Sequence, residues 1–296
     1  MSRKIKFVIT DVFAESRYSG NQLATFPEAS SLSVEEMQQI TREINFSETT
    51  FVLSGPQDNG GYRVRIFTPG CEVDFAGHPT LGTAAVIRNH LGRKPVNQVM
   101  LNLNVGPVPV TWQDPENHEG ILWMNQVEPV FGNSTDAARI AGALGLDRAD
   151  LDTRWPVESV STGLAHHIVP LKNMEALKKA AVQRAFYEPL ISQSDTKSIL
   201  VFCPGGYTDL QDLGVRVFDD YYGIPEDPAT GSGNGCLAAY LVRHRYFGDS
   251  PVDIQTGQGY EIGRPSTLRL KAYEKAGRIH VKVGGKVIQI AEGVWD

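Results

Sequence analysis

The feature that most constrains the fold is an internal repeat, in which a glycine-rich turn followed by a short apolar helix occurs twice in 296 residues. The first copy begins with residues 75–82 (Phe-Ala-Gly-His-Pro-Thr-Leu-Gly), and the second covers 229–241 (Ala-Thr-Gly-Ser-Gly-Asn-Gly-Cys-Leu-Ala-Ala-Tyr-Leu). Placing Gly77 over Gly231 gives an offset of 231 − 77 = 154. The preceding segments 64–67 and 215–218 are similar to each other, with an offset of 215 − 64 = 151. Two copies of strand, turn and helix predict two similar halves.

Composition excludes several classes of protein. The content of 41% hydrophobic and 21% charged residues is typical of a globular protein, and the net charge of −6 gives no reason to bind nucleic acid or an anionic membrane. No apolar run approaches the length of a membrane span, and the N-terminus lacks the apolar core of a signal peptide. We therefore expect a cytoplasmic protein. The three cysteines predict neither a disulfide framework nor a metal site, and we expect no metal and no cofactor.

The length and the order of predicted elements favour an α+β fold with two domains. Many short strands accompany one long helix in each half, so we expect a curved, mostly antiparallel sheet wrapped around a central helix in each domain. We place the N-terminal domain at 1–117, completed by a strand near 286–296, and the C-terminal domain at 118–285. We expect helices at 34–44, capped by Ser33, at 81–91, at 134–144, capped by Ser134 or Thr135, and at 174–186.

Glu48 is a lone carboxylate between Phe46 and Phe51, at the start of a strand that we expect to be buried. Burial of this kind suits a carboxylate to acid/base chemistry near neutral pH. The alternative is a charge at the end of a helix that faces solvent.

His78 lies between Gly77 and Pro79 at a helix start. A helix N-terminus lowers the pKa of an imidazole, so His78 would be neutral and able to accept or donate a proton. The alternative is a histidine that only satisfies nearby main-chain groups.

The segment 227–232 (Asp-Pro-Ala-Thr-Gly-Ser) places a carboxylate and two hydroxyls ahead of the second helix. One interpretation is an ordinary N-cap. The other is a binding site for a carboxylate, with Asp227 assisting proton transfer and the main-chain groups at Gly231 and Ser232 binding the anion. The extra glycines favour the second interpretation, because close approach of a ligand to the backbone requires them.

Three further residues have open roles. Asn21 is either a turn residue or an amide that binds substrate. Cys71 and Cys236 lie near the two helix starts, where a thiol pKa is expected to be lowered.

Taken together, these motifs resemble the PhzF family of phenazine biosynthesis-like isomerases, which have the diaminopimelate epimerase-like fold. The resemblance covers essentially the whole chain. It rests on several motifs that occur together in the same order, the last of which is segment 227–232. Earlier motifs are Asp11-Val12-Phe13, Gly20-Asn21-Gln22-Leu23-Ala24, Phe46-Ser47-Glu48-Thr49-Thr50-Phe51, Arg65-Ile66-Phe67-Thr68-Pro69, Gly77-His78-Pro79-Thr80-Leu81-Gly82 and Ser161-Thr162-Gly163-Leu164. The chain departs from the family pattern at 70–74, where Asp74 adds a charge.

The resemblance implies a homodimer whose active site lies in the cleft between the two domains, acting without a cofactor on a small carboxylate. It implies Glu48 as the acid/base, with His78 and Asp227 as further catalytic residues. The substrate-binding residues are then Asn21, Ser47, Gly77, Gly231 and Ser232.

We therefore predict a cofactor-independent isomerase that acts through Glu48, with trans-2,3-dihydro-3-hydroxyanthranilate or a related compound as its substrate. An epimerase, racemase or isomerase of an amino-acid-like substrate is one alternative, although His78 and Ser232 stand where the related epimerases have two cysteines. A non-catalytic binding protein on the same fold is the other, although a scaffold would need none of Glu48, His78 and Asp227.

Overall fold

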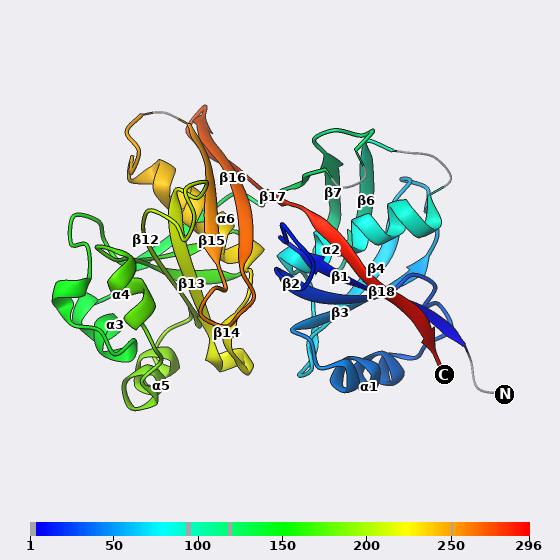
Figure 1. The fold of residues 1–296 in the computed structure, drawn as a ribbon, viewed down its shortest axis with the longest axis horizontal. Helices are drawn as coiled ribbons and strands as arrows, with labels where there is room; N and C mark the ends of the chain where they lie inside the picture. The colour runs from blue at the N-terminus through cyan, green and yellow to red at the C-terminus, as the bar shows by residue number, and fades with distance from the viewer. Residues whose placement is uncertain (1–3, 93–95, 118–119, 250) are drawn as a thin grey trace. The chain divides into compact units, whose positions relative to one another are not determined.

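The computed structural model describes residues 4–92, 96–117, 120–249 and 251–296. The chain divides into two compact units, Met1–Asn125 with Gly284–Asp296, and Gln126–Val283 (Figure 1). The boundary predicted between 117 and 118 falls beside residues 118–119, which lie outside the described ranges, so the predicted domain limits stay a prediction.

The first unit is a sheet with two helices. Its strands are β1 (Ile5–Val12), β2 (Asn21–Phe26), β3 (Glu48–Ser54), β4 (Tyr62–Phe67), β5 (Glu72–Val73), β6 (Gln98–Leu103), β7 (Gly106–Trp112), β8 (Leu122–Asn125) and β18 (Val287–Trp295). Its helices are α1 (Val34–Ile44) and α2 (Gly77–Val86), and α2 continues as a π-helical turn, η1 (Ile87–Leu91). β18 pairs with β1, which pairs with β2, both antiparallel. Parallel pairs join β2 to β3 and β4 to β6, and the remaining pairs are antiparallel.

The second unit contains more helices around a similar sheet. Its strands are β9 (Val130–Ser134), β10 (Glu158–Ser161), β11 (Ala165–Pro170), β12 (Ser198–Pro204), β13 (Leu213–Asp219), β14 (Ile224–Asp227), β15 (Val252–Gln258), β16 (Ser266–Lys275) and β17 (Arg278–Gly285), whose last two residues fall in the first unit. Its helices are α3 (Ala137–Ala143), α4 (Met174–Lys179), α5 (Arg184–Ser192) and α6 (Gly231–Arg243), with 3-10 turns η2 (Arg148–Asp150) and η3 (Asp220–Tyr222).

The two units share one order of strand pairing. β10 and β11 are antiparallel, β11 and β12 are parallel, β12 and β13 are antiparallel, and β13 and β15 are parallel. The same sequence of pairs runs from β1 to β6 in the first unit. The fold is therefore α+β, with two similar domains, each a curved and mostly antiparallel sheet wrapped around a central helix.

The central helices are α2 and α6, and they begin at the two glycines that the repeat aligned, Gly77 and Gly231. Every residue of α2 is buried, as is α6 from Gly231 to Leu241. Small residues in α2 allow the sheet to pack close to the helix. At Gly82, for example, an added Cβ would lie only 2.5 Å from the Leu23 side chain of β2. The repeat thus predicted the position of both central helices.

The outer helices cover the other face of each sheet. α1 is amphipathic and buries Met37 and Ile40, and its capping box at Ser33 is as predicted. It packs over a cluster of aromatic residues in which Phe26 and Phe51 stack with ring centroids 5.1 Å apart. In the second unit, α3, α4 and α5 share one apolar core with the outward-facing residues of β11, β12 and β13.

Three helix predictions were wrong in detail. The helix predicted at 174–186 is two helices, because Ala180 has extended backbone (ψ 128°) and its carbonyl accepts a hydrogen bond from Arg216. The cap predicted at Ser134 or Thr135 is Asp136, which accepts from the Ala138 N–H, while Ser134 ends strand β9. The helix predicted at 81–91 begins four residues earlier and becomes π-helical at Ile87.

Candidate active site

In the first unit, the start of β3 and the start of α2 bring two of the predicted residues together. Glu48 is the first residue of β3 and lies opposite Leu23 of the parallel neighbour β2. His78 is the second residue of α2. The His78 Nε2 atom lies 3.4 Å from Glu48 Oε2, and the two side chains are only 5% and 14% exposed. The sequence separates these groups by 78 − 48 = 30 residues, and the fold makes them neighbours.

Burial sets the protonation state of His78. It lowers the pKa of the imidazole to about 3, and a main-chain hydrogen bond with Gln22 only partly offsets this shift. The ring is therefore neutral near pH 7, as we expected, although burial rather than the helix N-terminus is the leading cause. The contact with Glu48 is consequently not an ion pair.

The other residues predicted in this unit lie at or just before the starts of β2, β3 and α2. Gly77 is the buried first residue of α2. Asn21 begins β2 and is 1% exposed, so it is not an exposed turn residue. Ser47 immediately precedes β3 and is half-buried. Asp74 is exposed in the turn that enters α2.

In the second unit, Asp227 is tied to the start of α6. It ends β14, is 6% exposed, and its Oδ2 accepts a hydrogen bond of 2.5 Å from the Thr230 hydroxyl. Gly231 and Ser232 are the first two residues of α6, and both are buried. Among the described residues, no N-cap side chain bonds to the first turn of α2 or α6. Thr230, the N-cap residue of α6, therefore does not cap the helix through its side chain.

Gln258 is a residue of this region that the sequence did not reveal. It is fully buried at the end of β15, and its Nε2 donates to the Asp227 carbonyl at 2.8 Å and to the Thr230 hydroxyl at 3.0 Å. Its Oε1 accepts from Thr230 N and Asn234 Nδ2. Nothing in the local pattern around Gln258 marks it, because its partners lie 24 to 31 residues away in the chain.

The expectation for Cys236 is corrected. Cys236 is buried inside α6, and this burial raises the pKa of its thiol to about 11 instead of lowering it. Cys71 is exposed in the loop before β5. Within the described ranges, no group of three or more His, Cys, Asp or Glu residues could hold a metal ion.

Two hollows on the surface lie away from these residues. One, of about 620 Å³, lies on the outer face of the second unit beside Arg184, Phe218 and Glu226. Another, of about 500 Å³, lies between α1 and the end of β18. Their linings contain none of the predicted site residues, so the chemistry of Glu48, His78 and Asp227 rather than cavity size identifies the candidate site. No helix in the described part of the chain is both long and apolar enough to cross a membrane.

Comparison with known proteins agrees with this architecture. The family model described as phenazine biosynthesis-like protein matches residues 10–293. A trans-2,3-dihydro-3-hydroxyanthranilate isomerase of Pseudomonas aeruginosa is 35% identical over 289 residues, covering 97% of this chain and 98% of the relative. The crystal structure of a PhzF family protein of Bacillus anthracis superposes with a TM-score of 0.91 at 27% identity, with each chain fully covered. A probable proline racemase of Agrobacterium radiobacter shares the fold at a TM-score of 0.65 and 11% identity, covering 98% of this chain and 92% of its own.

Proposed function

The chain belongs to the phenazine biosynthesis-like (PhzF) family and is an isomerase, and from this premise we propose that it moves a proton within a small carboxylate metabolite by means of Glu48. The observation that supports this most is the close approach of Glu48 to a neutral His78 at the start of a central helix. We propose trans-2,3-dihydro-3-hydroxyanthranilate or a related compound as the substrate, because the Pseudomonas aeruginosa relative is named for that reaction.

In the proposed reaction, the Glu48 carboxylate takes a proton from a carbon that conjugation has made acidic. The electron pair of the broken C–H bond moves into the conjugated system. Protonated Glu48 then returns the proton to another carbon of the same molecule, so the double bonds shift without net oxidation or reduction. Atoms and charge balance without any cofactor.

His78 would stabilise the protonated form of Glu48. A neutral imidazole has one donor and one acceptor nitrogen. A hydrogen bond to the main chain of Gln22 leaves Nε2 as the nitrogen that faces Glu48. With the other nitrogen donating, Nε2 is an acceptor for the proton that Glu48 holds between the two steps. Neutrality is essential here, because an imidazolium would favour the Glu48 carboxylate instead.

The helix starts would bind the anionic parts of the substrate. Free main-chain N–H groups and the partial positive charge at the starts of α2 and α6 favour a carboxylate or developing negative charge. Gly77, Gly231 and Ser232 would supply these groups, with Asn21 and Ser47 as further polar contacts. Asp227 would hold the amine or hydroxyl of the substrate. We also propose a homodimer in the cytoplasm, which molar-mass measurement in solution and cell fractionation would test.

The test is incubation of the wild-type protein with trans-2,3-dihydro-3-hydroxyanthranilate in deuterated buffer, followed by ultraviolet absorbance and mass. We expect the absorbance of the substrate to change and its product to take up deuterium. No change with this compound, together with deuterium at the α-carbon of an amino acid in a parallel panel, would replace the isomerase proposal by the epimerase alternative.

A further inference from the structure

An arginine–glutamate ion pair occurs at the same place in both units, on the strands that lead toward the central helices. In the first unit, Arg65 of β4 donates to both carboxylate oxygens of Glu72 in β5, with Nε to Oε1 at 2.7 Å. In the second unit, Arg216 of β13 donates to both oxygens of Glu226 in β14, at 3.0 and 2.8 Å. Each glutamate precedes the first residue of its central helix by five positions.

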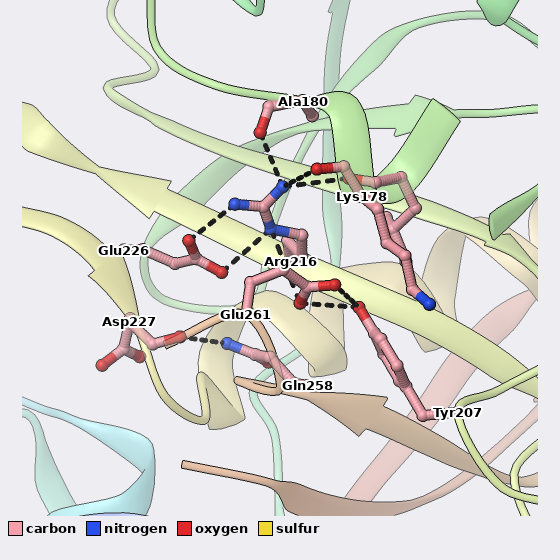
Figure 2. A network of polar contacts seen from close by, with 9 residues as sticks. Lys178, Ala180, Tyr207, Arg216, Glu226, Asp227, Gln258 and Glu261 are labelled. Carbon is pink, nitrogen blue, oxygen red and sulfur yellow. Dashed lines mark hydrogen bonds and ion pairs between the residues drawn. The ribbon is translucent and has the colours of Figure 1, made fainter. Parts of the chain in front are cut away.

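The pair in the second unit is more deeply buried and has more hydrogen-bond partners. The Arg216 and Glu226 side chains are 7% and 9% exposed, against 18% and 24% for Arg65 and Glu72. Arg216 Nη1 also donates to the carbonyls of Leu177, Lys178 and Ala180, at 3.0, 3.3 and 2.6 Å (Figure 2). These carbonyls end helix α4, so the guanidinium joins β14 to a fixed helix end.

A second carboxylate completes the network around Arg216. Glu261 lies 3.8 Å from Arg216 Nε and accepts hydrogen bonds from the Tyr207 hydroxyl at 3.0 and 2.8 Å. The guanidinium therefore has partners on every side (Figure 2). A planar, forked group with so many partners has little freedom to move.

Glu226 is followed directly by Asp227, and consecutive residues of a strand point to opposite faces of the sheet. Figure 2 shows the Asp227 side chain turned away from Arg216. Asp227 lies opposite Val217 in β13, and Gln258 holds its carbonyl from the other side. The ion pair on the outer face thus fixes the short strand that presents Asp227 on the inner face.

We propose that Arg216, through its ion pair with Glu226, is a positioning residue for Asp227; this inference rests on the function proposed above for Asp227. The first unit provides the matched control. There Glu72 is followed by Val73, which has no group for chemistry, and Arg65 has no comparable set of carbonyl partners among the described residues.

The test is a double-mutant cycle in the full-length protein. We expect Arg216→Lys, which keeps the charge and loses the fork, to lower kcat by at least about tenfold with KM changed by less than about threefold. Because Arg216 acts through Asp227, Arg216→Lys should cause no further loss in an Asp227→Asn background. Arg65→Lys should stay within about twofold of wild type. Losses that multiply in the double variant, or an equal loss for Arg65→Lys, would overturn the proposal.

Two additions keep the test decisive. If Arg216→Lys does not fold, Glu226→Gln, which keeps the shape of the side chain, takes its place in the cycle. If the wild type does not convert the compound named above, the proposal of that substrate fails, while labelling aspartate side-chain carbons with ¹³C still tests the positioning. The Asp227 carboxyl resonance, identified by its absence in Asp227→Asn, should move in Arg216→Lys and not in Arg65→Lys. An unmoved resonance in Arg216→Lys would contradict the inference.

Discussion

At the start of β3 the first unit has Glu48, and the corresponding place in the second unit belongs to Ser198. The register defines this correspondence: Glu48 lies opposite Leu23 on the parallel neighbour, and Ser198 lies opposite His166. At the helix start, His78 of α2 corresponds to Ser232 of α6 by the offset of 154. One unit therefore has an acid beside an imidazole where the other has two hydroxyls.

The second unit, in contrast, has the more buried and more extensively hydrogen-bonded surroundings. The second unit encloses its ion pair, and it ties Asp227 to Thr230 and Gln258. The first unit leaves its ion pair partly exposed. The two units thus share one topology, while the first has a carboxylate beside a neutral imidazole and the second has a single carboxylate within a network of hydrogen bonds.

The largest expected effect is a loss of stability in acid, to which His78 contributes from the first unit and His166 and His167 contribute from the second, where Asp219 opposes it. Burial lowers the pKa of His78 to about 3 and the pKa values of His166 and His167 to about 4, from an ordinary value of 6.5. Each depressed pKa gives stability that is present above pH 6.5 and is lost as the pH falls. Burial raises the pKa of Asp219 to about 6, so its contribution is present in acid and is lost as the pH rises through that value. We expect the unfolding free energy to fall by about 4 kcal/mol from pH 7 to pH 5.

Denaturant titrations at several pH values would measure this decline. Asp219→Asn removes the only opposing contribution of the four and should steepen the decline by about 1 kcal/mol. His78→Asn should make it shallower by about 2 kcal/mol. An unfolding free energy that is constant or rises toward pH 5 would contradict the assignment of neutral, buried imidazoles.

The two ion pairs should differ next in their contribution to stability. Arg216→Ala leaves Glu226 buried without its partner and should cost about 3 kcal/mol or more. Arg65→Ala removes a partly exposed pair and should cost about 1 kcal/mol or less. Thermal and urea unfolding of both variants would measure these losses of unfolding free energy. Equal losses would show that the two ion pairs stabilise their units to the same extent.

A smaller difference is expected inside the central helices. Gly82 of α2 corresponds to Cys236 of α6, and a Cβ at Gly82 would lie 2.5 Å from Leu23 and 2.9 Å from Val12. Gly82→Ala should therefore cost about 2 kcal/mol through overpacking. Cys236→Ala only removes a buried sulfur and should cost about 1 kcal/mol. If Gly82→Ala left the unfolding free energy measured in urea unchanged, the side chains around α2 would have to move aside more easily than the structure indicates.

The sequence predicted those features whose signal is local or repeated. The aligned glycines gave both central helices, and Ser33 with Glu36 gave the capping box of α1. The break at Ala180 was missed because the partner of its carbonyl, Arg216, lies 36 residues further along the chain. Gln258 was missed for the same reason.

In the candidate site, too, local motifs predicted which residues take part, but not the contacts that depend on the tertiary structure. The motif around Glu48 and the Gly-His-Pro turn identified both residues, whereas their 3.4 Å approach follows from strand register and helix packing. The thiol of Cys236 was expected to have a lowered pKa from its place near a helix start, and burial, which only the folded chain determines, reverses the shift. The joint action of the residues of both units on one substrate remains a prediction.

The most direct test of the central claim compares the two residues that share one place in the register. Glu48→Gln and Ser198→Ala would each be mixed with trans-2,3-dihydro-3-hydroxyanthranilate in deuterated buffer, and deuterium uptake would be followed by mass. We predict a rate at least about 10²-fold below wild type for Glu48→Gln and within about threefold of wild type for Ser198→Ala. Uptake at the wild-type rate by Glu48→Gln would contradict the account, because the proton would then move without this carboxylate.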